Sequence, residues 1–497
     1  MLYAQVMRVY SFYKKGLDLL PVEIEISLVP GVPAFHVTGL PDAVIKESIL
    51  RLKSALRHQG FEMPTREQVI FHLRPTHERK SSQGLDLALA AAYLFKTGQL
   101  PTPAAEGERL YLYGELSLEG SVTKPDDLDF LEGLGSGELL ITGPGSCALP
   151  RAVASSLKDL GSLKWCEGEF SEPPVAAGAS IFDSYEFCEK SAQMLLVAAT
   201  GEHNAFLAGP AGSGKTTFAR VLHELLRPPT MTEWRRISKI ERLAGRASPA
   251  VGPASSELSH ISARPFMAPH HSATDVALLG GGVPATPGEI TRAQHGMLLL
   301  DEFLEFSPHV VESLREPIER HEITILRKGV KVHFPADFML VATTNLCPCG
   351  DFKPSEKNKC QYSQVRCRSF FEKLSLPLLD RFDVVTFTHT WGYKKAATFA
   401  EIRDRVQAAQ KFALEMRGQL KMNSRLSALE VEPLISPFAL KNLLPDSLSS
   451  HRRRLSLLRV ARTIADLAAD EIVESRHLKQ AEDLTHRPFL DFRRAYN

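Results

Sequence analysis

The segment that most constrains the fold is Gly209–Thr216, which matches the pattern G-x-x-x-x-G-K-[ST] at every position. The apolar run Ala205–Ala208 precedes it, and apolar residues recur at helical spacing after it. A strand, a glycine-rich loop and a helix in this order are typical of a phosphate-binding loop. We therefore expect an α/β core built around a P-loop. An ordinary glycine turn before a helix is the alternative.

Each residue type in this loop suits phosphate binding. Gly212 and Gly214 allow a tight turn in which successive N–H groups point at phosphate oxygens, and the following helix adds the positive end of its dipole. Lys215 is expected to reach the β- and γ-phosphates, and Thr216 to place its hydroxyl on Mg²⁺. The predicted ATP-binding residues of this segment are Gly209, Pro210, Ala211, Gly212, Ser213, Gly214, Lys215, Thr216 and Thr217.

A second apolar run, Met297–Leu300, ends in two carboxylates. Asp301 is predicted to hold the Mg²⁺ together with Thr216, and Glu302 to polarise the water that attacks the γ-phosphate. A strand end that carries two solvated acids is the alternative. Its position downstream of a phosphate loop favours the catalytic interpretation.

Two further polar residues follow apolar strands. Asn345 ends the run Phe338–Thr344 and is predicted to orient the attacking water, although a structural turn asparagine would look the same. Arg381 lies between Asp380 and Asp383. We predict that it acts on the nucleotide of a neighbouring subunit, as an arginine finger does. A salt bridge to one of the two aspartates is the alternative.

The length of 497 residues fits about three domains of ~150 residues each. We expect an α+β domain over residues 1–170, a linker over 171–184, the P-loop core over 185–395 and a helical lid over 396–497. Period-two or compact apolar runs predict strands over 22–28, 35–37, 69–73, 110–116 and 138–142. Helical spacing predicts helices over 42–58, 85–94, 401–416, 456–469 and 474–484.

Composition limits the partners. A hydrophobic content of 44% with 24% charged residues is that of an ordinary globular protein. The net charge of +1 means that any contact with nucleic acid must come from a local patch or a ring of subunits. We expect no membrane contact and a cytoplasmic location, because the sequence has neither a bilayer-spanning run nor a signal peptide. Seven cysteines, an odd number, suit reduced thiols.

Several further segments carry a family resemblance, notably Pro269–Ala273, Leu314–Glu319, Leu379–Asp383 and Val460–Asp466. With the phosphate loop, they resemble the ComM/YifB family, the magnesium-chelatase-like branch of the AAA+ ATPases. The resemblance implies a homo-hexameric ring that uses ATP and Mg²⁺. It also implies branch migration of DNA in recombination, notably natural transformation, with single-stranded or branched DNA in the pore. A chaperone-like motor that remodels a protein complex, as in magnesium chelatase, is the alternative.

The resemblance extends to both ends of the chain. The first 170 residues resemble a Lon-protease-like domain with a ribosomal-S5-like fold. The nucleophile position of that domain falls near Gly84, so we expect no proteolysis; a relocated serine, Ser81 or Ser82, is the alternative. In the lid, Arg452 matches the sensor 2 arginine that contacts nucleotide. Because Arg453 and Arg454 follow it, a solvent-facing basic helix start is the alternative.

Three smaller groups complete the candidates. Four cysteines, Cys347, Cys349, Cys360 and Cys367, could hold zinc tetrahedrally, although their spacing lacks two C-x₂-C pairs and reduced thiols are the alternative. His270 and His271 lie in a glycine- and proline-rich segment that we expect to be a loop, resembling a helix-2 insert that faces the pore. The pattern over 323–334 predicts a hairpin. Its tip residues, Arg327, Lys328 and Lys331, are expected to contact DNA phosphates, unless they are merely solvated.

Overall fold

The structure is a computed structural model of the chain, and it forms two compact units, Met1–Glu172 and Pro173–Asn497. No helix within the described part of the chain is long and apolar enough to cross a membrane. The structure describes residues 7–15, 18–76, 80, 82, 84–103, 108–131, 133–135, 137–145, 147, 149–168, 180–244, 264–282, 285–327, 330–350, 370, 379–392, 394–441, 451–485, 487–488 and 490.

The first unit is built on a mixed sheet in the order β10-β9-β8-β5-β1-β2-β4-β3. Alternation along β2 buries Val22, Ile24 and Ile26 on one face, as period-two patterning requires. The strands are β1 (Met7–Lys15), β2 (Asp18–Pro30), β3 (Ala34–Thr38), β4 (Glu67–Arg74), β5 (Arg109–Leu112), β8 (Glu138–Thr142), β9 (Arg151–Val153) and β10 (Lys164–Cys166), with a separate hairpin of β6 (Glu115–Leu116) and β7 (Val122–Thr123).

Two helices pack in this unit. Helix α2 (Leu85–Lys96) is buried from Leu85 to Phe95 and packs on β1, β2 and β5. Helix α1 (Ala43–His58) begins at Asp42, whose carboxylate accepts from the N–H of Ile45 over 2.9 Å. The strands and helices expected from the sequence in this unit are confirmed. The run 110–116 divides into β5 and β6, and the long strand β1 was not predicted.

A close contact surrounds Gly84, the position that aligns with a protease nucleophile. A Cβ at Gly84 would lie 2.5 Å from the ring of Tyr113, so a side chain there would require the buried Tyr113 ring to shift. Ser82 is buried, and its hydroxyl lies 3.4 Å from that of Tyr113, which in turn donates to Asp127 over 2.9 Å. Ser81 lies outside the described residues. The absence of proteolysis stays a prediction.

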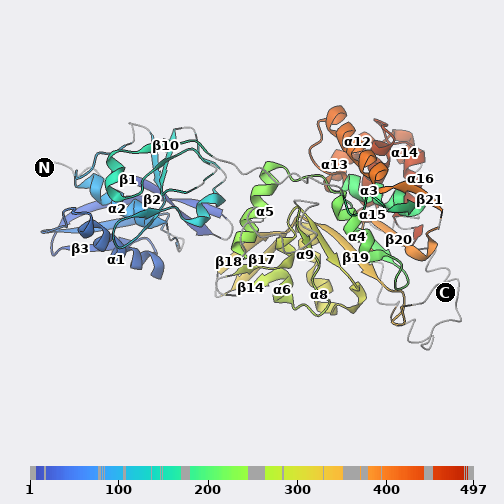
Figure 1. The fold of residues 1–497 in the computed structure, drawn as a ribbon, viewed down its shortest axis with the longest axis horizontal. Helices are drawn as coiled ribbons and strands as arrows, with labels where there is room; N and C mark the ends of the chain where they lie inside the picture. The colour runs from blue at the N-terminus through green and yellow to red at the C-terminus, as the bar shows by residue number, and fades with distance from the viewer. Residues whose placement is uncertain are drawn as a thin grey trace. The chain divides into compact units, whose positions relative to one another are not determined.

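The second unit contains a sheet of parallel strands in the order β13-β16-β19-β12-β20. Figure 1 labels two of these strands, β19 and β20. The central strands β12 and β16 are uninterrupted apolar runs, and β19 is apolar up to its last two residues, because both faces of such a sheet are covered. The strands are β12 (Ala205–Ala208), β13 (Phe266–Met267), β16 (Met297–Leu300), β19 (Met339–Thr344) and β20 (Val384–Phe387). This arrangement fits the α/β fold expected for the P-loop core.

Helices and small hairpins surround this sheet. The helices of the core are α3 (Glu189–Gly201), α4 (Lys215–Glu224), α5 (Met231–Leu243), α6 (Asp275–Leu279), α7 (Glu289–Arg292), α8 (Pro308–Ser313) and α9 (Arg315–Arg320). The predicted hairpin is confirmed as β17 (Glu322–Arg327) and β18 (Val330–Pro335). The segment expected to be a loop instead contains β13, α6 and a hairpin of β14 (Gly280–Gly281) and β15 (Thr286–Pro287). The pair β11 (Glu186–Cys188) and β21 (Lys395–Thr398) joins the two ends of the core.

The chain after residue 398 is helical among the described residues, as its periodicity predicts. The helices are α12 (Phe399–Arg417), α13 (Ala428–Val431), α14 (Pro437–Lys441), α15 (His451–Leu467) and α16 (Ser475–Leu484). Helices α12 and α15 pack against α3 of the core, and the three lie side by side in Figure 1. One apolar core runs from α3 and α4 into these helices. The separation of a distinct lid therefore stays a prediction.

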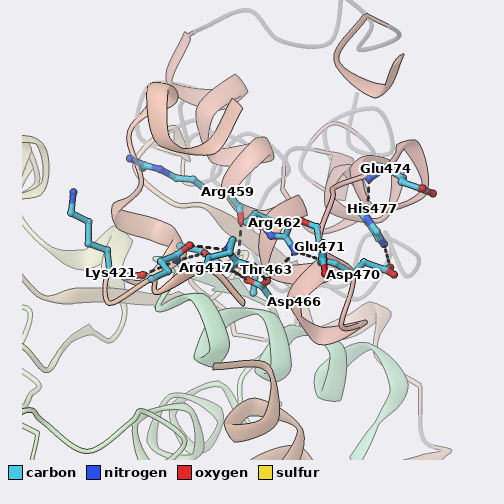
Figure 2. Close-up of polar contacts among 12 residues, drawn as sticks. Arg417, Lys421, Arg459, Arg462, Thr463, Asp466, Asp470, Glu471, Glu474 and His477 are labelled. Carbon is cyan, nitrogen blue, oxygen red and sulfur yellow. Dashed lines mark hydrogen bonds and ion pairs between the residues drawn. The ribbon is translucent and has the colours of Figure 1, made fainter. Parts of the chain in front are cut away.

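A buried ionic network holds the C-terminal helices together (Figure 2). Arg462 is fully buried and donates to Asp466 over 2.9 Å and to the Glu471 carbonyl over 2.7 Å. Arg417 donates to both oxygens of Asp466, over 2.7 and 3.0 Å. Asp466 also accepts from Asn423 over 2.7 Å. A buried carboxylate is stable here because several donors satisfy its oxygens.

Candidate nucleotide-binding and hydrolysis site

The phosphate loop connects β12 to α4 at the carboxyl end of the sheet. Gly212 and Gly214 have φ of 72° and 81°, a region that glycine enters without a steric penalty. Among the described residues other than its chain neighbours, none has a heavy atom within 4 Å of a Cβ built at either glycine, which leaves open space on this side of the loop. The loop is tied to its surroundings by two main-chain bonds, from Gly209 N–H to the Thr344 carbonyl and from Ala211 N–H to the Gly350 carbonyl.

Lys215 is folded back onto its own loop. Its ammonium group donates to the carbonyls of Gly209 and Pro210 over 3.0 and 2.8 Å and to Asn345 Oδ1 over 3.1 Å. Burial lowers the pKa of Lys215, and the carboxylates of Asp301 and Glu302 oppose this shift. The bond to Asn345 brings together two predicted site residues that are far apart in the sequence.

Asp301 lies directly opposite the phosphate loop. Thr216 Oγ1 donates to Asp301 Oδ2 over 2.9 Å, and Thr343 Oγ1 donates to Asp301 Oδ1. Strands β16 and β19 are adjacent and parallel, which explains why their carboxyl ends meet here. Sequence reasoning missed Thr343, although a polar residue at the carboxyl end of a strand was a usable signal.

Glu302 follows Asp301 in an unusual conformation. Its φ and ψ of 54° and 44° are left-handed, which is uncommon for a residue with a side chain. Its carboxylate lies 3.3 Å from Nδ1 of His271, an atom pair that sequence reasoning did not anticipate. The Glu302 side chain is 52% exposed and so remains accessible to water.

Arg381 does not reach this site within the described structure. Its guanidinium lies 4.0 Å from Glu312 of α8, and its side chain is only 10% exposed. Burial lowers the pKa of Arg381, and Glu312 opposes the shift. The adjacent aspartates have other partners, since Asp380 accepts from Arg453 and Asp383 accepts from Ser456 over 2.6 Å. The predicted action on a neighbouring subunit stays a prediction.

The three consecutive arginines of α15 reach three different carboxylates. Arg452 pairs with Glu319 of α9 over 2.9 Å, and Arg454 with Glu432 over 3.1 Å, while Arg453 pairs with Asp380. Of the three arginines, Arg452 is the one that pairs with α9, and Arg381 approaches the preceding helix, α8. Its sensor 2 role stays a prediction.

The remaining candidates fall partly outside the described residues. Cys360, Cys367 and Lys328 lie outside them, and the side chain of Arg327 is not described. Cys347 is buried, Cys349 is partly buried, and Lys331 is exposed. No group of three or more His, Cys, Asp or Glu side chains that could hold a metal ion occurs within the described part of the chain. The zinc prediction gains no support from the described residues.

The donors present fit ATP and Mg²⁺. A lysine ammonium held by two loop carbonyls and an amide can transfer these bonds to phosphate oxygens. The hydroxyl of Thr216 and the carboxylate of Asp301 are oxygen ligands of the kind that Mg²⁺ takes, directly or through water. Both glycines leave space on the loop for a ligand.

The parallel sheet, the phosphate loop and the Asp301–Glu302 pair define the class of P-loop ATPases, which use a nucleotide and Mg²⁺. The chain matches the family described as magnesium chelatase, subunit ChlI, over residues 186–396, the ChlI subunit of Mg-chelatase over 22–128, and the ChlI C-terminal region over 396–485. These three matches follow one another along the chain.

Whole-chain similarity narrows the assignment. The chain is 31% identical to YifB of Salmonella typhimurium over 498 residues, which cover 94% of each chain. It is 30% identical to the competence protein ComM of Haemophilus influenzae over 508 residues, which cover 95% of this chain and 96% of ComM. The magnesium-chelatase 38 kDa subunit of Cereibacter sphaeroides is 26% identical over 322 residues, or 60% of this chain. The chain belongs to the ComM/YifB family of magnesium-chelatase-like proteins.

Proposed function

We propose that the protein is a ring-forming AAA+ ATPase that couples ATP hydrolysis to the movement of DNA, with branch migration in recombination as its activity. The observation that carries the proposal is the pairing of Lys215 with Asn345, which links the phosphate loop to the strand that follows the basic hairpin. The competence name of the ComM relative supports a role in natural transformation.

The chain's own residues would divide the work at the nucleotide. Bound ATP with Mg²⁺ supplies a phosphoryl group that can pass to water. Lys215 would bind phosphate oxygens, and Thr216 with Asp301 would orient the metal. Glu302 would take the proton of the attacking water as a general base, with Asn345 orienting that water. Because Lys215 donates a hydrogen bond to Asn345, a change in the phosphate contacts of Lys215 would also change the position of Asn345.

Assembly would complete the site. Arg381 approaches Glu312 of α8, and Arg452 pairs with Glu319 of the adjacent helix α9. We propose that Arg381 reaches the nucleotide of the adjacent subunit in a homo-hexamer, and that Arg452 contacts nucleotide as the sensor 2 arginine. A cation brought there would stabilise charge on the transferring group. The ring would also repeat each local basic group around one pore.

The DNA contact would lie on the hairpin β17–β18. Lys331 is exposed on β18, and the sequence places Arg327 and Lys328 beside it at the turn. Strand β18 ends at Pro335, and β19 begins shortly afterwards at Met339 and ends just before Asn345. Movement at Asn345 during hydrolysis could therefore shift the hairpin through a short, direct connection.

A chaperone-like motor is the second candidate, because the chain also resembles a magnesium-chelatase subunit. Steady-state ATP hydrolysis with and without forked DNA separates the two. Stimulation that weakens as salt rises supports the DNA motor, because phosphate contacts release counterions. Hydrolysis that no DNA changes at low salt favours the protein-remodelling function.

A further inference from the structure

A cavity of about 400 Å³ lies at the amino ends of the parallel strands of the second unit. Its lining includes residues that come just before β12, β13, β16 and β19, namely Glu202, Arg264, His295 and Asp337. Because the phosphate loop follows the carboxyl end of β12, the cavity lies at the opposite edge of the sheet from the nucleotide site. A cavity of this size is large enough for a small organic ligand.

One part of the cavity wall carries charges that already neutralise one another. Arg227 donates to both oxygens of Glu233, over 3.0 and 2.6 Å, and Arg264 donates to Glu233 over 3.2 Å. Glu202 lies 3.7 Å from Arg264, so two guanidinium groups face two carboxylates. This part of the wall therefore leaves little net charge for a ligand.

A second part of the wall presents unused hydrogen-bond donors. Arg425 donates through Nε to Asp337 over 2.8 Å and through Nη2 to the Phe338 carbonyl over 2.9 Å, while Nη1 has no hydrogen-bond partner among the described residues. His321 Nδ1 lies 3.8 Å from Asp337 Oδ1, too far for a hydrogen bond, and neither ring nitrogen has a partner in the part of the chain that the structure describes. Lys421 also lines the cavity and is exposed. These three side chains supply donors for an anion.

The electrostatic surroundings of His321 favour an anion as well. Burial lowers the pKa of His321, and the charges of Arg425, Arg459 and Arg452 lower it further, while Asp337 opposes them. The arginines that disfavour a proton on His321 attract a negative group beside it for the same reason. A neutral imidazole still donates through one ring N–H. A phosphate group would therefore find both positive charge and several donors here.

Apolar side chains continue the wall beside these donors. Leu420 and Met422 flank Lys421 in the sequence and line the same cavity. The Leu420 side chain is large and apolar, and the residues that the structure describes leave it 79% exposed. An organic group packed against it would remove this apolar surface from water. Donors for an anion beside apolar surface suit a phosphate ester better than inorganic phosphate.

The cavity also touches both ends of the hairpin β17–β18. His321 directly precedes β17, and Asp337 lies two residues after the end of β18. The N–H of Ala336 donates to the His321 carbonyl over 2.8 Å, which closes the hairpin at its base. Arg425 comes from the C-terminal part of the chain, in the 3₁₀ turn Asn423–Arg425. A ligand that touches His321 and Arg425 would therefore bridge the base of the hairpin and the C-terminal helices.

We propose that this cavity is a second ligand site, which binds a small phosphate monoester and ties the base of the hairpin β17–β18 to the C-terminal helices. The phosphate lies against Arg425, His321 and Lys421, where the guanidinium and the ammonium give charge-assisted hydrogen bonds. The organic group packs against Leu420 and Met422. The site is separate from the nucleotide site, and its existence does not depend on the proposed movement of DNA.

The first test measures binding by calorimetry, with AMP, GMP and ribose 5-phosphate as probes. The unaltered protein is first saturated with a non-hydrolysable ATP analogue and Mg²⁺, so that the nucleotide site is filled. At least one probe should bind with a Kd below about 1 mM, and the same compound without its phosphate should bind at least about tenfold more weakly. Binding of none of the three probes, or equal binding without the phosphate, overturns the proposal.

Two variants locate the bound phosphate. His321→Asn should weaken binding about fivefold to tenfold, because a ligand donor is lost. Asparagine suits the φ of 55° at this position. Lys421→Met should weaken binding about threefold, a smaller factor because the ammonium is exposed. Lys411→Met is the matched control and should leave the affinity unchanged, since Lys411 and Lys421 are both exposed and each pairs with a glutamate. Unchanged affinity in both His321→Asn and Lys421→Met overturns the proposal.

The second test locates the probe by amide hydrogen exchange, again with the nucleotide site filled. The bound probe should slow exchange in peptides that cover residues 320–324, 336–340 and 420–426, because it bridges these segments. Slower exchange in the peptide over 209–216 alone would place the probe in the nucleotide site and overturn the proposal. If DNA fails to stimulate hydrolysis while these three segments are protected, the proposed function fails and the second site stands. Stimulation by DNA without such protection retains the function and removes the site.

Discussion

Lys215 Nζ donates to Asn345 Oδ1 over 3.1 Å, which joins the phosphate loop to the end of β19. Lys215 begins α4, after the phosphate loop that follows β12, and Asn345 directly follows β19, the parallel strand next to β12. This contact places the predicted cation and the predicted water-orienting amide at one point.

Two substitutions separate binding from hydrolysis. Lys215→Ala should abolish ATP binding, because the phosphates lose their main side-chain cation. Glu302→Gln should keep ATP affinity within a fewfold while hydrolysis falls by at least about 10²-fold, because an amide is not a general base. Titration with a fluorescent nucleotide and a phosphate-release assay measure the two effects. Normal hydrolysis by Glu302→Gln would show that another group activates the water.

Arg381 tests action between subunits. Arg381→Ala should leave ATP binding intact and lower hydrolysis by up to about 10³-fold, as for an arginine finger. Hexamers mixed from Arg381→Ala and Lys215→Ala subunits should regain part of the activity, because some sites combine an intact loop with an intact arginine. Glu312→Gln is the control for the local contact at 4.0 Å. No recovery in hexamers shown to be mixed would argue against action in trans.

Asp466 tests the buried network of Figure 2. Asp466→Ala should lower the free energy of unfolding by about 3–5 kcal/mol, because it leaves the buried Arg462 without its carboxylate. Asp483→Ala removes a pair with Arg487 in which both side chains are about half exposed, and should cost ~1 kcal/mol or less. Urea unfolding of the two variants makes the comparison. If both variants lost the same free energy of unfolding, leaving the buried Arg462 without its carboxylate would cost no more than breaking an exposed ion pair.

Asp383 provides a dependence on pH. Burial alone would raise its pKa, but the imidazole of His203 3.6 Å away, the hydrogen bond from Ser456 and the charge of Arg459 outweigh burial and lower the pKa to about 2. Because this value is below that of an unfolded aspartate, the stabilisation is present above pH ~4 and is lost as the pH falls toward 2. The advantage of the unaltered protein over Asp383→Asn should be about 2 kcal/mol at pH 6. Urea unfolding from pH 6 to 2.5 should show this difference shrinking; a constant difference would contradict the assignment.

The sequence predicted those features that follow from local pattern. Strand β8 has the predicted bounds, and helices α12 and α16 lie within two residues of theirs, because apolar periodicity fixes such elements. The polar ends of β16 and β19 were expected to meet at the phosphate loop. The contacts of Thr216 with Asp301 and of Lys215 with Asn345 are in accord with that expectation.

Other features could not be predicted from pattern. The contact of His271 with Glu302 depends on the pairing of β13 with β16, and β13 is a two-residue strand with no periodicity to detect. The strand β1 escaped notice because its polar and apolar residues, which include Arg8 and Lys14, do not alternate cleanly. The short elements β13, α6, β14 and β15 lie in a segment rich in glycine and proline. Such a composition indicates a loop even where the chain forms regular structure.

The central claim is that ATP hydrolysis at Lys215 and Glu302 drives DNA through the hairpin β17–β18. The most direct measurement follows ATP hydrolysis and branch migration together on one forked DNA, for the unaltered protein and for Lys328→Ala/Lys331→Ala. Lys411→Ala, an exposed lysine on α12, is the matched control. We predict that DNA stimulates hydrolysis in the unaltered protein and the control, and that the double variant keeps its basal hydrolysis but loses stimulation and branch migration together. Normal branch migration by the double variant, or no effect of DNA on the unaltered protein, would contradict the account.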